Sequence, residues 1–324
     1  MINKVQSRPL YIQKLEALLR RIPSQHEKRK EMEDELSRRM SGFKGELSLD
    51  YYLRLIPDKS IRIFHDIRLL DGEYTFQIDT LLMCTRFFLI LEVKNFSGSL
   101  LFDRTFKQLV RRINNKEETF PDPITQVKRQ QLQLKNWLKI RKLPEIPIET
   151  LVVISNPYTY IMPPENPTEV KRLVTHSANL ISRLSNLENK HNHDALTEKA
   201  LARISKTLLK NQIPDNRSVL EKYQITKHEL IKGVVCLDCS PFLMKREYGK
   251  WICTQCGAAS KEAHIDALRD YLLLWGETIS NQELREFLGI SSASIAARML
   301  SSLQLPYTGS TKDRRYSLAG LLNN

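Results

Sequence analysis

The sequence predicts an α/β core domain, in which a mixed sheet is flanked by helices, followed by two small C-terminal modules. Between residues 43 and 156 the pattern runs helix, three strands, helix, strand, which is the order of one α/β domain. Four of the five cysteines form two close pairs, and helical stretches separated by a short turn follow them. We therefore predict five segments: an N-terminal helical segment (1–41), the α/β core (42–160), a helical connector (161–232), a cysteine-bearing ribbon (233–262) and a helix-turn-helix-like, winged-helix-like domain (263–324).

The charge balance favours a polyanionic partner. The 324 residues include 50 Lys and Arg against 37 Asp and Glu, a formal net charge of +13. Neutralising phosphates releases counterions, so this excess favours nucleic acid, although a merely basic protein remains the alternative. No apolar run approaches the roughly 20 residues of a membrane span, and the N-terminus lacks the apolar core of a signal peptide. We therefore expect a soluble cytoplasmic protein with no membrane partner.

The elements of the first half follow from hydrophobic periodicity and turn signals. Residues 10–40 are predicted to be helical, and from Gly42 a loop is expected to open a second helix. The segments "IRIFHDIRLL", "DGEYTFQIDTLLMC" and "FFLILEVKN" are predicted strands, and "SGSLLFDRTFKQLVRR" is expected to continue their sheet as a hairpin. A helix is predicted after Pro123, then the buried strand "IETLVVISN", the loop "PYTYIMPPENP" and a polar helical region over 170–230.

Three charged residues stand on two of the predicted strands, in an otherwise apolar stretch. Asp79 and Glu92 lie on successive strands that a turn joins, so antiparallel pairing would bring their carboxylates side by side. A divalent cation relieves the repulsion between two such carboxylates, and Mg²⁺ suits oxygen ligands. Lys94 follows Glu92 by two residues and shares its face of the sheet, where it can orient water and stabilise negative charge on a phosphate. The alternative is a simple ion pair between Glu92 and Lys94.

Four short motifs in order resemble one known family. "GFKGE", "QID", "LEVKNFSG" and "PITQ" are similar to motifs of the NERD, or nuclease-related, domain, over residues 42–156 and about a third of the chain. That family is assigned to the PD-(D/E)XK superfamily, so the resemblance implies a restriction-endonuclease-like core. The resemblance also implies the active residues, which are Glu46 on the first helix of the core, Asp79, Glu92, Lys94 and Gln126.

The same resemblance implies the metal ligands. Glu46, Asp79 and Glu92 would hold Mg²⁺ or Mn²⁺, with the carbonyl of Val93 as a further ligand. Glu46 by itself is better explained as an acidic residue in the first turn of a helix, which the helix dipole favours. One residue departs from the family pattern, because Thr80 stands where a histidine often follows the aspartate.

The cysteine pairs predict a structural zinc ion. Cys236, Cys239, Cys253 and Cys256 have the spacing C-x2-C-x13-C-x2-C, and the thirteen intervening residues contain the turn segment "REYGKW". A hairpin at this turn would bring the two pairs together, and four thiolates suit a closed tetrahedral Zn²⁺ site. The pairing of these cysteines in disulfides explains both short spacings less well.

The last sixty residues predict a helix-turn-helix. A capping box from Ser280 to Glu283 begins one helix, Gly289 ends it, and a Ser- and Ala-rich helix follows. A hairpin with a turn at Thr308-Gly309 would then form a wing. The residues predicted to contact nucleic acid are Arg298 in the last helix and Lys312, Arg314 and Arg315 in the wing. The alternative is a small helical bundle that serves packing or protein contact.

Together these features predict a metal-dependent nuclease acting on DNA, with C-terminal nucleic-acid-binding modules. A non-catalytic DNA-binding protein on a nuclease-like scaffold and a transcriptional regulator are the alternatives. The sequence leaves the oligomeric state open.

Overall fold

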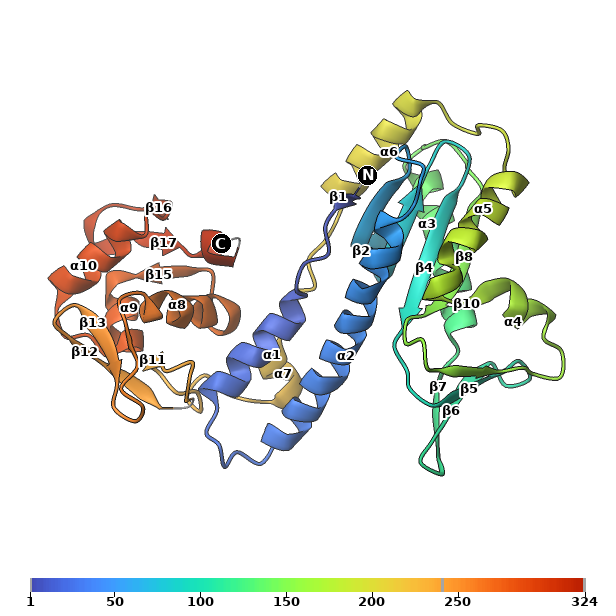
Figure 1. Ribbon diagram of the computed structural model, residues 1–324. Helices are drawn as coiled ribbons and strands as arrows, with labels where there is room; N and C mark the ends of the chain where they lie inside the picture. Colours follow the sequence, from blue (N-terminus) through green and yellow to red (C-terminus); the bar gives the residue numbers. More distant parts are fainter. Residues whose placement is uncertain (1, 240–241, 323–324) are drawn as a thin grey trace. The chain divides into compact units, whose positions relative to one another are not determined.

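The computed structural model divides into two compact units, each made of two stretches of chain (Figure 1). The first unit contains Met1–Arg8 and Arg39–Asp215, and the second contains Pro9–Arg38 and Asn216–Asn324. The structure describes residues 2–239 and 242–322, with the backbone alone for Lys312. Within these residues, no helix combines the length and the apolar character that crossing a membrane requires.

The main sheet of the first unit is mixed, as the sequence predicts. Its order is β1-β2-β3-β4-β8-β10, formed by β1 (Ile2–Lys4), β2 (Arg62–Asp71), β3 (Tyr74–Met83), β4 (Phe88–Lys94), β8 (Ile148–Ile154) and β10 (Val174–His176). Strands β2, β3 and β4 are antiparallel neighbours, whereas β1, β8 and β10 each pair in parallel. The predicted order of three strands, a helix and a fourth strand is therefore confirmed.

Helices cover both faces of this sheet. On one face α2 (Arg29–Arg54) and α5 (Leu180–Lys190) bury leucines such as Leu49 and Leu184 against Leu91 and Val153 of the strands. On the other face α3 (Pro123–Ile140) and α6 (Glu198–Lys210) pack on the strands through side chains that include Trp137. Complete burial of one such side chain contributes about 1.5–3 kcal/mol. The α/β class is thus confirmed.

The two predictions for the N-terminal helices are wrong in detail. The expected helix over 10–40 is broken after α1 (Leu10–Arg21), because Ile22 precedes Pro23 and takes an extended conformation. The loop expected at Gly42 does not form, since α2 continues without interruption through Gly42 and Gly45. A Cβ on Gly45 would lie 2.5 Å from the Cβ of Asn95, so this glycine permits close packing and does not end a helix.

The segment after β4 forms a second sheet, so the expectation that it continues the first is wrong. This sheet has the order β7-β6-β5-β9, from β5 (Ser99–Asp103), β6 (Gln108–Ile113), β7 (Lys116–Pro121) and β9 (Tyr160–Met162). Gly98, with φ of +89°, redirects the chain before β5, and a Cβ there would meet the carbonyl of Arg112 at 2.4 Å. Strand β9 lies in the segment expected to be a loop. The short helix α4 (Thr168–Leu173) and the 3₁₀ turn η1 (Ser177–Asn179) flank β10.

The second unit joins α1 to the C-terminal third of the chain. Its first elements are α7 (Val219–Tyr223), β11 (Val234–Val235), β12 (Leu243–Glu247), β13 (Lys250–Cys253), β14 (Ala259–Ser260) and α8 (Ala263–Leu274). The rest are β15 (Thr278–Ser280), α9 (Asn281–Leu288), α10 (Ala293–Ser302), β16 (Tyr307–Thr308), η2 (Thr311–Asp313), β17 (Arg315–Ser317) and η3 (Ala319–Leu322). The predicted capping box of α9 and its end at Gly289 are confirmed.

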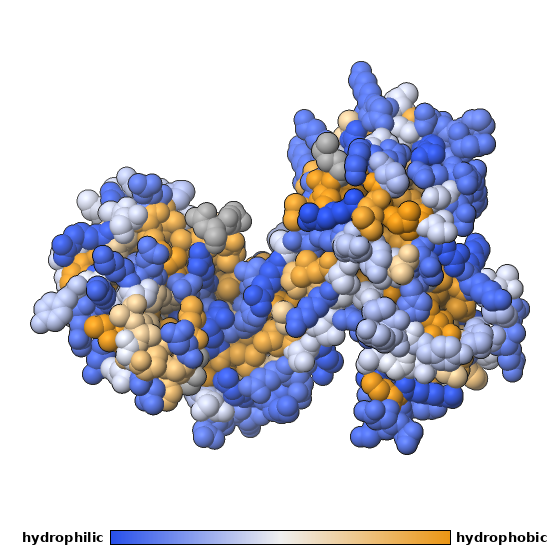
Figure 2. Space-filling model, viewed as in Figure 1, coloured by the Kyte–Doolittle hydropathy of each residue, from blue (hydrophilic) through white to orange (hydrophobic). Residues whose placement is uncertain are grey.

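The ribbon and the C-terminal helices share one hydrophobic core. Trp251 of β13 belongs to the same buried cluster as Leu268 of α8 and Phe287 of α9. The guanidinium of Arg21 on α1, 1% exposed, pairs with Asp270 of α8 at 2.8 Å and lies over the ring of Phe287. Outside these cores the visible surface is mostly hydrophilic with scattered apolar areas, as Figure 2 shows.

Candidate functional sites

Asp79 and Glu92 lie side by side where β3 and β4 meet. The antiparallel pairing of the two strands reaches Thr80 opposite Leu91, which places the two acidic residues at the next step. The carboxylate of Asp79 accepts a hydrogen bond of 2.9 Å from the backbone N–H of Val93. Glu92 is buried and Asp79 half-buried. The structure thus brings together the two carboxylates that the sequence singled out.

Lys94 and two glutamines of α3 surround Glu92. The ammonium of Lys94 donates to Glu92 Oε1 at 2.6 Å and to Gln126 Oε1 at 3.1 Å. Gln130, one turn further along α3, donates from Nε2 to Glu92 Oε2 at 2.7 Å and to the carbonyl of Gln77 at 3.0 Å. Both oxygens of Glu92 therefore have donors, and the ion pair considered from the sequence is present.

Glu46 comes from the opposite side of the sheet. It lies in the interior of α2, so its expected place in a first helical turn is wrong. Its Oε2 accepts a hydrogen bond of 2.6 Å from Nε2 of Gln6. Burial raises the pKa of Glu46 to about 7; the bond from Gln6 opposes this rise, whereas the charges of Asp66 and Glu92 add to it.

The electrostatics of this carboxylate cluster, Glu46, Asp79 and Glu92, suit a cation. Burial, and then the charges of Glu92 and Glu46, raise the pKa of Asp79 well above its usual range. Burial by itself would lower the pKa of the Lys94 ammonium. The negative charges of Glu92 and Asp79 outweigh this effect, so the pKa of Lys94 is raised. The mutual repulsion of the three carboxylates is larger than the attraction that the single ammonium of Lys94 provides. Carboxylate oxygens are also the ligand atoms that hard divalent cations prefer.

The cluster is nevertheless open in this structure. Among the described residues, the groups of three or more metal-ligating side chains whose donor atoms all lie within 4.8 Å do not include these carboxylates. Glu46 stands on α2, whereas Glu92 accepts a hydrogen bond from Gln130 of α3, on the other face of the sheet.

Residues that the sequence did not single out also contribute to this region. Gln130 follows Gln126 by four residues, a spacing that puts both on one helix face and could have revealed it. Asp66 has φ of +48° in the middle of β2, and its carbonyl accepts from Nζ of Lys4 and, at 2.8 Å, from Nε2 of Gln212. No local pattern in the sequence signals Asp66 or Gln6.

Thr80, which departs from the family pattern, faces a buried histidine. Its hydroxyl lies 3.2 Å from Nδ1 of His65 on the neighbouring strand, and Nε2 of His65 lies 3.3 Å from Asp50. Thr80 and His65 are each 1% exposed. These contacts tie β2 and β3 to α2.

A family model matches part of the first unit. Residues 41–155 match the family model of the nuclease-related domain, NERD. The first unit carries a NERD domain. No curated protein and no solved structure matches the chain. Glu46, Asp79, Glu92, Lys94 and Gln126 all lie within the matched stretch, whereas Gln6 and the cysteine pairs lie outside it.

The four cysteines of the ribbon converge as their spacing predicts. The Sγ atoms of Cys236, Cys239, Cys253 and Cys256 all lie within 4.8 Å of one another. The Sγ–Sγ distance is 3.7 Å between Cys236 and Cys256 and 3.4 Å between Cys239 and Cys253. Both distances are close to the roughly 3.8 Å that separates two thiolate sulfurs bound to one tetrahedral zinc ion. Hydrogen bonds from the backbone N–H groups of Cys256 and Gln255 lower the pKa of the Cys253 thiol to about 6, although burial acts to raise it.

The hairpin β12–β13 brings the cysteine pairs together. Tyr248 and Gly249 form its turn with positive φ, as the sequence predicts for this turn segment. The cluster therefore fits a zinc ion in a closed structural site, outside the NERD domain.

The basic residues predicted to contact nucleic acid lie on two C-terminal elements. Arg298 is exposed on α10. Arg314 lies over the ring of Tyr307, 4.3 Å from its centroid, and Arg315 pairs with Glu283 at 2.9 Å. The side chain of Lys312 lies outside the described part of the chain.

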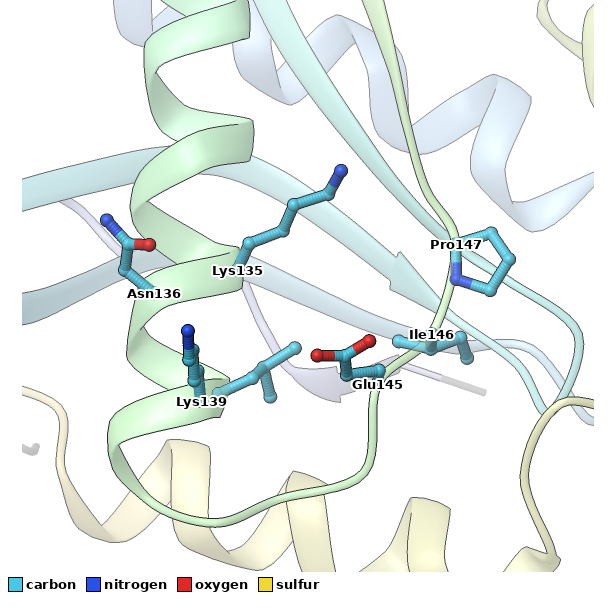
Figure 3. A pocket seen from close by; sticks show the side chains of 7 residues that line it. Lys135, Asn136, Lys139, Glu145, Ile146 and Pro147 are labelled. Carbon is cyan, nitrogen blue, oxygen red and sulfur yellow. The ribbon is translucent and has the colours of Figure 1, made fainter.

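A cavity of about 400 Å³ lies beside the last turns of α3, on the NERD domain (Figure 3). It is lined by Lys135, Asn136, Leu138, Lys139, Glu145, Ile146 and Pro147. Gln126, by contrast, lies in the first turn of the same helix. This cavity is therefore separate from the carboxylate cluster.

Proposed function

We propose that this protein is a metal-dependent nuclease that hydrolyses phosphodiester bonds, with DNA as its substrate. The observation that carries the proposal is the meeting of Asp79, Glu92 and Lys94 at neighbouring strands of a NERD domain. A protein that only binds nucleic acid has no need for carboxylates that repel phosphate.

Each residue has a role in this proposal. Glu46, Asp79, Glu92 and the carbonyl of Val93 would hold Mg²⁺ or Mn²⁺, which supplies Lewis-acid stabilisation of the phosphate when bound. Lys94 orients water and stabilises the negative charge that develops on the phosphate oxygens. Gln126 accepts a hydrogen bond from Lys94 and so directs its ammonium.

The C-terminal region would supply affinity for the substrate. The cysteine cluster would hold a structural Zn²⁺, and Arg298, Lys312, Arg314 and Arg315 would contact phosphates. The net charge of +13 supports a polyanionic substrate.

A second candidate is a non-catalytic DNA-binding protein or regulator that keeps the NERD domain as a scaffold. The ion pair of 2.6 Å between Lys94 and Glu92 favours it, because this pair satisfies the lysine without any ligand.

A cleavage assay separates the two candidates. The wild type is incubated with linear, closed-circular and single-stranded DNA and with RNA, in EDTA, Mg²⁺ or Mn²⁺, beside Asp79→Ala. Cleavage that requires the metal and disappears in the variant supports the nuclease. Equal binding of DNA by both proteins with no cleavage under any condition supports the scaffold.

A further inference from the structure

Gln6 contacts the carboxylate cluster from outside the NERD domain. It lies between β1 and α1, thirty-five residues before the matched stretch begins. The residue is 8% exposed, and its Nε2 donates the 2.6 Å hydrogen bond to Oε2 of Glu46. A residue that precedes the matched stretch thus contacts a carboxylate of α2.

The segment that carries Gln6 is fixed to the sheet. Strand β1 pairs in parallel with β2, with Ile2 opposite Ile63 and Lys4 opposite Phe64. Val5 is 68% exposed and Ser7 is also exposed, so the side chains on both sides of Gln6 are solvent-accessible while Gln6 is buried. The burial of Gln6 is therefore specific to this position and not a property of the whole segment.

The side-chain amide of Gln6 is only partly hydrogen-bonded by the described residues. Its Oε1 is buried and has no hydrogen-bond partner among the described residues. Leaving a buried acceptor unsatisfied costs about 1–3 kcal/mol, and such groups in native proteins usually meet a water molecule or an ion. The Nε2 group of Gln6 therefore binds one carboxylate oxygen of Glu46, and Oε1 of the same amide is a buried acceptor beside it.

We propose that Gln6 is a positioning residue of the carboxylate cluster, and that the segment 2–8 completes the site of the NERD domain. The amide fixes the orientation of Glu46 by occupying Oε2, which leaves Oε1 to face a divalent cation. This role rests on the proposed function, since it requires that the cluster bind a cation. Partners that orient a metal ligand typically change metal affinity 10- to 100-fold when they are removed.

The test is a calorimetric titration with Mn²⁺ of full-length wild type, Gln6→Met, Glu46→Ala and the double variant. Gln6→Met preserves side-chain volume and removes the donor, and Val5→Ala in the same segment is the matched control. We expect Gln6→Met to bind Mn²⁺ about tenfold more weakly and Val5→Ala to bind as the wild type does. Because Gln6 acts through Glu46, adding Gln6→Met to Glu46→Ala should cause no further loss.

Thermal unfolding shows whether each variant is folded, and Gln6→Asn, whose shorter amide cannot reach Glu46, serves as a second variant. Unchanged Mn²⁺ affinity in folded Gln6→Met or Gln6→Asn overturns the role of Gln6 alone. The role of Gln6 is also overturned if Gln6→Met weakens Mn²⁺ binding as much in the Glu46→Ala variant as in the wild type, since Gln6 would then act through a group other than Glu46. A wild type that binds no Mn²⁺ overturns the proposed function and this inference together.

Discussion

The cysteine cluster and the carboxylate cluster differ in how the chain assembles them. The four thiols come from two short segments that one hairpin brings together, and their Sγ atoms already lie within 4.8 Å of one another. The carboxylates come from α2, β3 and β4, and their supporting side chains come from α3 and the N-terminal segment. Local chain geometry is sufficient to form the first site, whereas the second needs the whole unit to be folded.

The two clusters also differ in the interaction partners that the protein itself provides for their side chains. The thiols contact mainly one another, so a metal ion is the natural partner that completes them. Glu92 is already bound by Lys94 and Gln130. We therefore expect metal removal to unfold the ribbon, but to leave the NERD domain folded.

The largest effect is expected at the cysteines. Purified wild type should contain close to one zinc ion per chain, and Cys253→Ser should contain none, because three thiolates do not close a tetrahedral site. The second unit should then lose its cooperative thermal transition while the first keeps its own. Elemental analysis and calorimetry of both proteins test this. A zinc-free wild type with both transitions intact would contradict the comparison.

At the carboxylates we expect loss of activity without loss of structure. Asp79→Ala and Glu92→Ala should abolish metal-dependent cleavage and weaken Mn²⁺ binding. DNA binding should persist or tighten, because removing a carboxylate reduces repulsion toward phosphate. Cleavage assays, Mn²⁺ calorimetry and DNA-binding titrations measure the three quantities. Equal Mn²⁺ affinity of wild type and Asp79→Ala would show that the cluster is not a metal site.

Lys94 should separate rate from metal binding. Lys94→Ala should slow cleavage about 10²- to 10³-fold, because it removes a donor that acts on developing charge, while Mn²⁺ affinity changes little. Single-turnover rates at saturating metal measure this effect. If the residue served only as an ion-pair partner of Glu92, the variant would cleave at the wild-type rate.

Asp122 tests how much the start of α3 contributes to the stability of the first unit. It caps α3, accepting from the N–H groups of Ile124 and Thr125, and pairs with Arg104 at 2.6 Å. Asp122→Ala should destabilise the first unit by about 2–4 kcal/mol, because it removes a cap and leaves Arg104 without this partner. Denaturant unfolding at neutral pH measures the loss, and Thr105→Ala in the nearby turn is the control.

The same residue gives a pH dependence. Although burial favours its neutral form, hydrogen bonds from Thr125 and Arg104 lower the pKa of Asp122 below its usual value. Its contribution is therefore present above the unfolded pKa of about 3.9 and is lost as pH falls through the lower folded value. The stability difference between wild type and Asp122→Ala should be constant from pH 7 to 5 and shrink below pH 4. A constant difference down to pH 2 would contradict this assignment.

The smallest effects are expected at two glycines of α2, with opposite signs. Gly45→Ala should destabilise the first unit by about 1–3 kcal/mol, since its Cβ would overlap Asn95. Gly42 has nothing within 4 Å of a Cβ, so Gly42→Ala should stabilise it by about 0.5–1 kcal/mol. Chemical denaturation of both variants measures the pair. If Gly42→Ala also lowered the stability of the first unit, a cause other than contact with Asn95 would be required, and the prediction would be wrong.

The sequence predicted those features that depend on local pattern. Alternation and apolar runs identified the strands that carry Asp79 and Glu92, and the spacing of Cys236 to Cys256 predicted their convergence. The start of α3 and the capping box at Ser280 were also visible in the sequence.

Features that depend on tertiary contact were not predictable in this way. The change of pattern at Gly42 predicts a loop, because a sequence does not show that the next glycine, Gly45, permits the close approach of Asn95 to a continuous helix. The sequence after β4 predicts a continuation of the first sheet and not a second one, since strand periodicity does not identify the partner strand. Gln6 and Asp66 join the carboxylate region only through pairing between segments far apart in the chain.

The discontinuity of the two units has a consequence for synthesis on the ribosome. Residues 9–38 emerge well before the rest of their unit, which begins only at Asn216. At about 5–20 residues per second, α1 waits on the order of ten seconds or more for its partners. During that time Leu15, Leu18 and Ile22, fully buried in the finished protein, are available to chaperones or to aggregation. Nascent chains stalled once residue 215 has emerged should therefore protect the NERD domain from protease while α1 is cut.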